Sequence, residues 1–322
     1  MADILLEVKN LKTYFYTKAG VAPAINDISF SIGKGKTLGV VGESGCGKSM
    51  TALSIMKLVP DPPGKIVGGE IFFEGRDLLR LEEKDMRQVR GKDISMIFQE
   101  PMTSLNPVLT IGDQITEALL MHGRIKRKEA REIALEMLNM VKIPDPEKRI
   151  NEYPHQMSGG MRQRVMIAMA LCCKPKLLIA DEATTALDVT IQAQILHLIN
   201  DLKSRLNTSV LFITHDLGVI SQIADDIIVM YAGNIVESGS IREIFRNPLH
   251  PYTKGLLECV PDVGRKAKTL HVIKGMVPSL YELPKGCPFS PRCDRAMTGC
   301  HSEKPGLMEK GGHSVRCMLY NG

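Results

Sequence analysis

Short runs of apolar residues alternate with longer segments in which apolar residues recur every three or four positions, up to about residue 258. The short runs predict β-strands, and the longer segments predict amphipathic helices. Such alternation is typical of an α/β domain with a largely parallel sheet. The predicted strands are Thr37–Val41, Ile94–Phe98, Leu177–Ala180, Ser209–Ile213 and Ile227–Met230.

Two segments depart from this alternation. The segment Leu5–Ser31 alternates more finely, with breaks at Gly20 and at Asn26-Asp27, which predicts a small antiparallel sheet. Between about 108 and 160, apolar residues such as Leu135 and Leu138 have helical spacing, which predicts a helical insertion. We therefore expect residues 1–258 to form one domain with these two additions.

The end of the chain has a different composition. From Pro261 onward it contains six prolines and four of the eight cysteines, with few long periodic segments. A small region with little apolar core is commonly stabilised by a metal or another cross-link. We predict a cysteine-rich C-terminal domain at residues 259–322.

Composition and charge exclude several classes of protein. The 41 basic and 36 acidic residues give a net charge of +5, without the basic block typical of nucleic-acid binding. The longest apolar run, Val165–Cys173, is shorter than the roughly 18 residues that span a bilayer. The first residues lack the pattern of a signal peptide, so we expect a cytosolic chain, in which clustered cysteines favour metal binding over disulfides.

The segment Gly42-Glu-Ser-Gly-Cys-Gly-Lys-Ser49 follows one predicted strand and precedes a predicted helix, Met50–Leu58. This is the context of a phosphate-binding loop, in which glycines turn backbone N–H groups toward phosphates, a lysine reaches the β and γ phosphates, and a hydroxyl binds Mg²⁺. The alternative is an ordinary glycine-rich turn. The candidate nucleotide-binding residues are Gly42, Ser44, Gly45, Gly47, Lys48, Ser49 and Met50.

Two carboxylates, Asp181 and Glu182, end an apolar strand. Beside a phosphate-binding loop this pattern predicts one acid near Mg²⁺ and a second that polarises the attacking water. Alone, the same pair could cap the following helix. The chain has no Asn-Lys-x-Asp segment for reading guanine, which favours ATP over GTP.

The segment Ser158-Gly-Gly-Met-Arg-Gln163 resembles the signature motif of ATP-binding cassette (ABC) ATPases, with Met157 and Met161 where that family usually has Leu and Gln. Gln99 matches the family's Q-loop, Ala186-Leu-Asp188 its D-loop, and His215 its switch histidine. The resemblance implies a P-loop NTPase fold of the ABC ATPase type. It has a RecA-like core, an N-terminal antiparallel β subdomain and a helical insertion.

The resemblance also implies a role for each matching residue. Catalysis would involve Glu182, His215, Gln99 and Lys48, and Mg²⁺ would be bound by Ser49, Gln99 and Asp181. Two cassettes would enclose two ATP molecules between them, so that the signature of each contacts ATP bound to the other. The residues of that second contact would be Ser158, Gly159, Gly160 and Asp188. For stacking on adenine we expect Phe15, with Tyr16 as the next candidate.

Three segments resemble one subfamily more specifically: Ile94–Pro107 and the two glycine motifs that begin at Gly42 and Ser158. They look like the ATP-binding subunit of bacterial oligopeptide/dipeptide permeases. These systems use two cassette types, and the segments resemble the first. The segments Asn247–Thr253 and Gly286–Cys293 match the same subfamily. This implies a peripheral protein at the cytoplasmic face of the inner membrane. Its partners would be a second homologous cassette, two membrane permease subunits gripped through Pro101–Pro107, and an external peptide-binding protein, with no nucleic acid.

Other functions stay open. A related importer for nickel chelates or glutathione would keep the same machinery, whereas a soluble cassette acting on nucleic acid or ribosomes would not use a membrane subunit. The four late cysteines, Cys287, Cys293, Cys300 and Cys317, have a spacing that predicts a four-thiolate site without naming its metal, and Zn²⁺ or no metal is compatible with it. The subfamily resemblance implies a [4Fe-4S] cluster.

Overall fold

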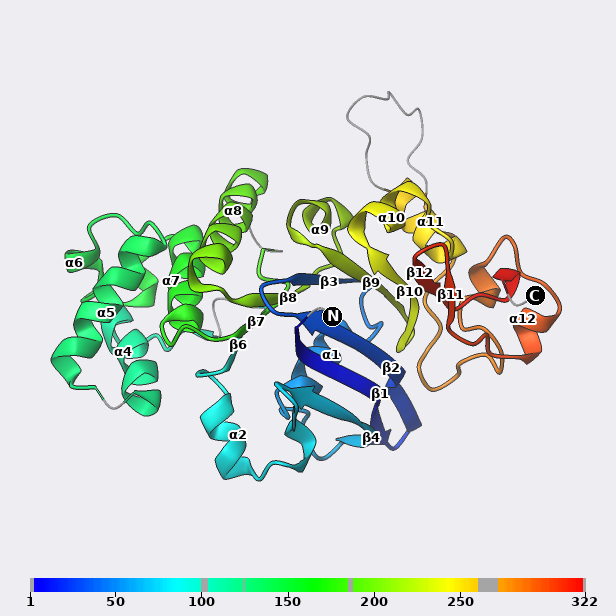
Figure 1. The fold of residues 1–322 in the computed structure, drawn as a ribbon, viewed down its shortest axis with the longest axis horizontal. Coiled ribbons are helices and arrows are strands. Elements are labelled where there is room, and N and C mark those ends of the chain that lie inside the picture. Colours follow the sequence, from blue (N-terminus) through cyan, green and yellow to red (C-terminus); the bar gives the residue numbers. More distant parts are fainter. Residues whose placement is uncertain (1–2, 100–103, 124, 185–187, 260–271, 321–322) are drawn as a thin grey trace. The chain divides into compact units, whose positions relative to one another are not determined.

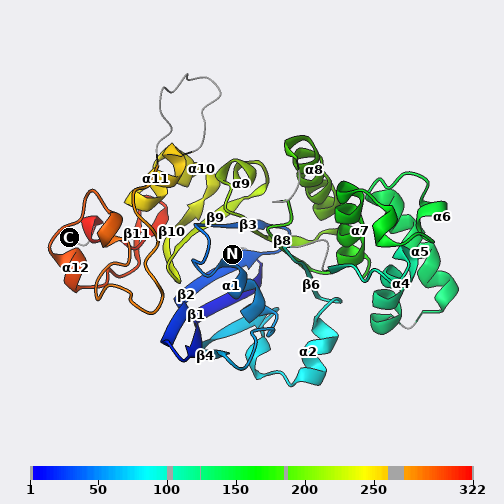
Figure 2. The same cartoon turned by 180° about the vertical axis from the view of Figure 1, so that it is seen from behind.

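The computed structural model describes residues 3–99, 104–123, 125–184, 188–259 and 272–320 (Figures 1 and 2). The chain divides into two compact units. Unit 1 combines the chain up to Leu5 with Ile32–Lys36 and Arg80–Ile213. Unit 2 combines Leu6–Ser31 and Thr37–Leu79 with the chain from Thr214 onward.

The strands of unit 1 are β6 (Ile94–Ile97), β7 (Leu177–Asp181) and β8 (Ser209–Ile213). They are parallel, with β7 between the other two. Every residue of β7 and β8 is buried, which explains why these strands are uninterrupted apolar runs rather than alternating ones. The strands predicted at these positions are confirmed.

Helices make up most of the rest of unit 1. Helix α5 is amphipathic, because its buried residues Ala130, Ala134, Met137 and Leu138 recur at helical spacing. It packs against α4 and α7. The described helices of this unit are α2 (Glu83–Val89), α4 (Ile111–His122), α5 (Arg127–Met140), α6 (Pro146–Arg149), the 3₁₀ helix η2 (Pro154–Gln156), α7 (Gly159–Leu171) and α8 (Val189–Leu206).

Unit 2 holds an antiparallel sheet in the order β2-β1-β4-β5, which confirms the small sheet predicted near the start of the chain. Its strands are β1 (Ile4–Thr17), β2 (Gly20–Gly33), β4 (Gly64–Phe73) and β5 (Arg76–Asp77). The break expected at Asn26-Asp27 is wrong, because β2 continues through it. Asp27 takes a left-handed conformation (φ 63°), which aspartate tolerates better than most residues.

The other described strands of unit 2 lie side by side in the order β11-β12-β10-β9-β3. Strands β3 (Thr37–Val41) and β9 (Asp226–Tyr231) are parallel and lie where strands are predicted. Strands β10 (Asn234–Ser240), β12 (His313–Val315) and β11 (Met308–Lys310) extend the sheet in antiparallel fashion. The last described strands of the chain therefore continue the sheet that contains β3.

Short helices complete unit 2. They are α1 (Lys48–Ile55), η1 (Leu78–Arg80), α9 (Leu217–Ile223), α10 (Ile241–Arg246), α11 (Pro251–Glu258), η3 (Ser290–Arg292), α12 (Gly299–Ser302) and η4 (Met318–Tyr320). A small apolar cluster of Leu249, Val315 and Cys317, with Tyr320 packed against it, anchors the last segment. Within the described parts of the chain, no helix has both the length and the apolar character needed to cross a membrane.

Candidate functional site

The loop between β3 and α1 has a shape that requires glycine at two positions. Gly42 and Gly47 have φ values of 153° and 104°, in the region that residues with a side chain rarely adopt. A Cβ atom on Gly42 would lie 2.2 Å from the Met230 carbonyl oxygen, and one on Gly47 would lie 2.4 Å from the Ala24 carbonyl oxygen. Neighbouring backbone therefore encloses the loop at these two glycines.

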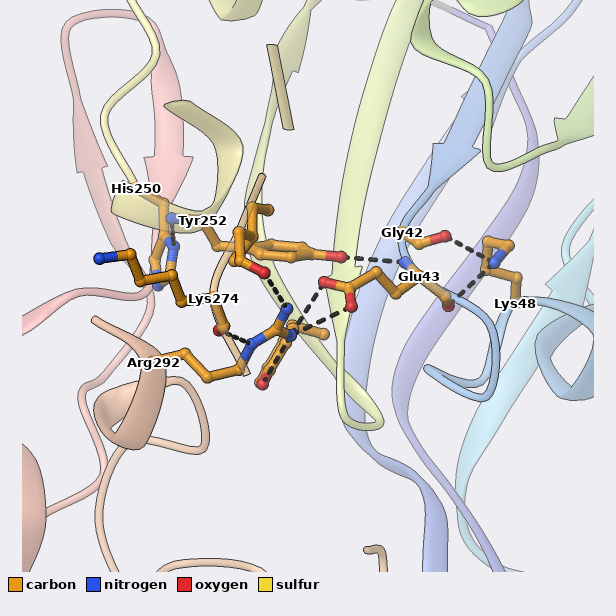
Figure 3. A network of polar contacts seen from close by, with 9 residues as sticks. Gly42, Glu43, Lys48, His250, Tyr252, Lys274 and Arg292 are labelled. Carbon is orange, nitrogen blue, oxygen red and sulfur yellow. Dashed lines mark hydrogen bonds and ion pairs between the residues drawn. The ribbon is translucent and has the colours of Figure 1, made fainter. Parts of the chain in front are cut away.

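Lys48, the first residue of α1, turns back into this loop (Figure 3). Its Nζ donates hydrogen bonds to the carbonyl oxygens of Gly42, at 2.7 Å, and of Glu43, at 3.1 Å. The side chain is buried. The loop thus closes around a lysine ammonium group, as a phosphate-binding loop requires.

The other predicted loop residues lie at its rim and at the start of the helix. Ser44 and Gly45 are exposed, and nothing lies within 4 Å of a Cβ placed on Gly45. Ser49 and Met50 are half-buried in the first turn of α1. This arrangement leaves backbone of the loop open to a ligand on the side of Ser44 and Gly45.

In unit 1, the predicted Q-loop glutamine and the predicted base lie in contact. Gln99, just after β6, donates from Nε2 to Oε2 of Glu182 at 3.0 Å. Glu182 follows Asp181, the last residue of β7, and both carboxylates are largely buried. Glu182 has a left-handed backbone (φ 48°), and its N–H donates to the Ile213 carbonyl oxygen at 2.9 Å. Chain positions 83 residues apart are thereby brought together.

The predicted signature begins α7. Ser158 is the N-cap residue, and its Oγ accepts the Met161 N–H at 3.4 Å. Ser158 and Gly159 are exposed, Gly160 is half-buried, and nothing lies within 4 Å of a Cβ placed on Gly159. An exposed helix N-terminus with free access to its backbone N–H groups can bind an anion.

Two further predicted residues, Asp188 and His215, lie at the starts of helices. Asp188 is the N-cap of α8, where its side chain accepts the Ile191 N–H at 2.9 Å, and it is exposed. The other D-loop residues, 186 and 187, and residues 101–103 of the segment Pro101–Pro107 lie outside the described residues. His215 is exposed in unit 2, immediately before Asp216, the N-cap of α9.

The two candidate aromatics lie at the end of β1 in unit 2. Phe15 is half-buried and is paired with Gly64 of β4. Tyr16 is 51% exposed, and its N–H donates to the Pro63 carbonyl oxygen. Both stay predictions for adenine stacking, and the greater exposure of Tyr16 leaves more of its ring accessible.

The four late cysteines are all reduced, and three of them, Cys287, Cys300 and Cys317, are buried. The Cys287 N–H donates to the Cys300 carbonyl oxygen at 2.8 Å, and the Cys300 thiol accepts the Met297 N–H at 3.4 Å. Among the described residues, no group of three or more His, Cys, Asp or Glu side chains has an arrangement that could hold a metal ion. The thiols therefore share one region without forming a coordination geometry.

The titration of these thiols reflects their surroundings. Burial raises the pKa of Cys287 and Cys293, and it raises the pKa of Cys317 to about 11. Negative charge on the other cysteines of the set raises the pKa of each further. A bound cation would counter both effects, because metals that take thiolate ligands bind the deprotonated form of cysteine.

Two side chains that support the loop, Tyr252 and Arg292, were not predicted from the sequence. Glu43, inside the loop, forms an ion pair with Arg292, and its N–H donates to the Tyr252 hydroxyl. The available signal was indirect, because Tyr252 and Arg292 lie within the two late segments that match the permease subfamily, Asn247–Thr253 and Gly286–Cys293.

Two features define a P-loop ATPase. The first is a glycine loop that surrounds the buried Lys48, and the second is a strand that ends in Asp181 and is followed by Glu182, which Gln99 contacts. Residues 25–185 match the ABC transporter family, and residues 236–300 match the oligopeptide/dipeptide transporter C-terminal region. The chain belongs to the ABC transporter family and carries this C-terminal region.

Its similarity to known proteins extends over nearly the whole chain. It is 56% identical to the Oligopeptide transport ATP-binding protein AppD of Bacillus subtilis (strain 168), over 98% of this chain and 97% of that protein. It is 52% identical to the Dipeptide transport ATP-binding protein DppD of the same organism, over 98% of this chain and 94% of that protein. A solved dimeric ATP-binding cassette in a post-hydrolysis state, bound to ADP and Pi, is 28% identical, with a TM-score of 0.66 over 74% of this chain and 99% of that one.

Proposed function

We propose that this chain is the ATP-hydrolysing subunit of a bacterial importer of dipeptides or oligopeptides. Two similar proteins carry the names of oligopeptide and dipeptide transport ATP-binding proteins, and the similarity includes the C-terminal region. Importers for nickel chelates or glutathione are the nearest alternatives. The external binding protein and the membrane subunits would select the cargo.

The hydrogen bond between Gln99 and Glu182 is the observation that carries the hydrolysis step. Lys48 and the loop N–H groups would hold the phosphates, and Glu182 would orient and polarise the attacking water while Gln99 fixes its carboxylate. Mg²⁺, when bound by Ser49, Asp181 and Gln99, supplies charge neutralisation on the phosphates. His215 is the proposed contact to the γ-phosphate. Catalysis then depends on positioning and electrostatics.

Completion of each ATP site requires a second cassette. The exposed N-terminus of α7, with Ser158 and Gly159 accessible, is suited to contact phosphate bound to a partner. A similar solved cassette is dimeric with ADP and Pi bound. We infer a heterodimer with a homologous cassette, closed by ATP and reopened by hydrolysis, on the cytoplasmic face of the membrane. Two permease subunits would contact the segment Pro101–Pro107 and the helices that follow it.

Hydrolysis is tested by Glu182→Gln, which keeps the size of the side chain and one acceptor oxygen for Gln99 but removes the base. We expect ATP binding to be retained while turnover falls about 1,000-fold or more, because water is no longer polarised. The matched control is Glu136→Gln, an exposed position on α5 of the same unit. Turnover of the Glu182→Gln variant at the wild-type rate would remove Glu182 as the base.

Transport is tested in a bacterium that lacks the gene for this chain. Uptake of a labelled dipeptide or oligopeptide should return with the wild-type gene and not with Lys48→Ala. Co-purification of the chain with integral membrane proteins should accompany uptake. Uptake that is unchanged by deletion, together with co-purification of RNA or ribosomes, would favour the soluble cassette instead.

We infer that Cys287, Cys293, Cys300 and Cys317 hold a [4Fe-4S] cluster, with Zn²⁺ as the alternative. When bound, the cluster would supply a cross-link for a region with little regular structure. Anaerobic purification should give about four irons and four sulfides per chain, lost in Cys293→Ser and kept in Cys173→Ser. One zinc without sulfide would overturn the cluster and keep the four-thiolate site.

A further inference from the structure

An arginine of the C-terminal region, Arg292, contacts the phosphate-binding loop (Figure 3). Arg292, at the end of η3, has a side chain that is only 4% exposed. Its Nη1 lies 2.9 Å and 3.1 Å from the two carboxylate oxygens of Glu43, the second residue of the loop. A charge-assisted contact of this kind, with the guanidinium removed from water, is stronger than an exposed ion pair.

The guanidinium is fixed on its other sides. Its Nε donates to the Lys274 carbonyl oxygen at 3.0 Å, and Nη2 reaches the Ile273 carbonyl oxygen at 3.4 Å. Nη1 also reaches the Tyr231 hydroxyl at 3.3 Å, and the rings of Tyr231 and Phe289 lie about 6 Å from the guanidinium carbon. The arginine therefore has a defined position before it meets the loop.

Glu43 is held through its backbone as well. Its N–H donates to the hydroxyl of the buried Tyr252 at 2.9 Å, and its carbonyl oxygen accepts from Lys48 Nζ at 3.1 Å. Tyr252 belongs to α11 and stacks edge-on against Tyr231 at 4.7 Å. Residues 231, 252 and 292 thus form one support behind the loop residue that contacts the lysine.

We propose that Arg292 is a positioning residue for the ATP site, which neutralises the Glu43 carboxylate and holds this part of the loop in its phosphate-binding shape. The proposal rests on the proposed role of the loop in ATP binding. A carboxylate within the loop repels the phosphates of ATP, and Arg292 cancels that charge from the side away from Lys48. Arg292 acts on ATP through Glu43 and does not itself contact the nucleotide.

The test compares affinity for MgATP and MgADP in the wild type and in purified full-length variants. Arg292→Met leaves the Glu43 charge uncompensated and should weaken MgATP binding about tenfold, with a smaller loss for MgADP, which carries less negative charge. The double variant Glu43→Gln/Arg292→Met removes both charges and should restore affinity to within about threefold of wild type. KM for ATP should rise in Arg292→Met while kcat changes little.

Arg316→Met is the matched control. Arg316 also precedes a cysteine of the C-terminal set, yet it donates to the carbonyl oxygens of Ile235 and Pro305 instead of to a carboxylate of the loop. Its loss should leave ATP affinity at the wild-type value. Thermal unfolding of each variant monitors folding, and Arg292→Gln repeats the comparison should Arg292→Met fail to fold.

Two results would overturn the inference. The first is wild-type ATP affinity in Arg292→Met. The second is an equal loss of affinity in Arg292→Met and the double variant, or in Arg292→Met and Arg316→Met, which would assign Arg292 a purely structural role. Lys48→Ala separates the two proposals. Unchanged ATP affinity in Lys48→Ala would reject the loop as the ATP site, whereas its loss beside an unaffected Arg292→Met would reject the inference alone.

Discussion

The phosphate-binding loop and the cysteine region, both in unit 2, reach defined structures in opposite ways. The loop motif is eight consecutive residues that run from the end of a buried strand into the first turn of a helix, and its shape follows from glycines that lie against neighbouring carbonyl groups. The four cysteines are spread over residues 287–317, among 3₁₀ turns, a four-residue helix and two three-residue strands. The loop is flanked by a five-residue strand and an eight-residue helix, whereas the elements beside the cysteines are only three or four residues long.

This difference shows which sites a motif can describe. In the loop, the residues of the motif are adjacent in the sequence, and the flanking strand and helix fix their geometry. The order of the residues is therefore nearly sufficient to predict the structure of the loop. In the cysteine region, a small apolar cluster and a few buried polar contacts position the residues. Such contacts join residues that are distant in the chain. Substitutions at these contacts, and at the glycines of the loop, test the difference between the two regions.

The largest expected effect is that of Gly47→Ala in the loop. The added Cβ would lie 2.4 Å from the Ala24 carbonyl oxygen at a residue with φ 104°, so the loop must change shape. We expect ATP affinity to fall about 1,000-fold or more, which corresponds to about 4 kcal/mol. Isothermal titration with MgATP measures the loss, and Gly306→Ala, where nothing lies within 4 Å, is the control.

The matched change in the other region is Gly286→Ala. Its Cβ would lie 2.3 Å from the Cys300 carbonyl oxygen, so iron analysis should show less of the proposed cluster, and titration with MgATP should show most of the ATP affinity retained. Complete loss of ATP binding in Gly286→Ala would show that the two regions fold as one site and would end the comparison.

The loop and the strands around it could be predicted from the sequence because each is encoded locally. The strands Thr37–Val41 and Ser209–Ile213 are found at the predicted residues, and the helix expected at Met50–Leu58 is found at Lys48–Ile55. A buried strand is a run of apolar residues wherever it occurs, and a loop that needs left-handed backbone needs glycine.

The ion pair between Glu43 and Arg292 could not be predicted, because 249 positions separate the two residues and neither stands out by type. The break expected at Asn26-Asp27 failed for a related reason. Strand β2 continues through these residues beside β1, and the Asn26 N–H donates to the distant Gly233 carbonyl oxygen, although both residue types favour turns. In both cases tertiary contacts outweigh the local signal.

The next effect concerns Glu237 of β10, which holds the last segments of the chain together. Its buried carboxylate accepts the N–H groups of Leu249, at 2.7 Å, and of His250, at 2.9 Å, and lies 3.3 Å from His313 Nδ1 on β12. Glu237→Ala leaves these groups buried without a partner and should lower the free energy of unfolding by about 3 kcal/mol. Denaturant unfolding measures it against Glu303→Ala at an exposed position, and equal values would contradict this role.

A smaller effect depends on pH. Burial lowers the pKa of His250 to about 3, and its neutral Nδ1 accepts the Tyr252 N–H at 3.0 Å, while the Glu237 carboxylate accepts its backbone N–H. The unfolded chain binds this proton below pH 6.5 and the native protein does not, so stability should fall as the pH drops from 6.5 toward 3.

His250→Asn keeps an acceptor for the Tyr252 N–H but does not titrate. Between pH 7 and pH 5, the free energy of unfolding should fall by about 2 kcal/mol more in the wild type than in this variant. Urea unfolding at the two pH values measures the free energy of unfolding of each protein. The contribution of the carboxylates is common to both proteins and cancels when the two decreases are subtracted. The same decrease in both proteins would show that His250 is protonated in the native state.

The smallest expected effect separates the buried support of the loop from a second contact of the C-terminal region. The Tyr281 hydroxyl accepts a hydrogen bond from Thr17 Oγ1 of β1 at 3.0 Å, but both residues are exposed. In Tyr281→Phe, water replaces the lost partner, so we expect a change of about 0.5 kcal/mol or less in stability and less than about twofold in ATP affinity. Titration with MgATP beside Arg292→Met makes the comparison direct. If Tyr281→Phe lost as much ATP affinity as Arg292→Met, the charge on Glu43 would not be the cause of the loss. Any contact between the C-terminal region and its neighbours would then affect the affinity for ATP.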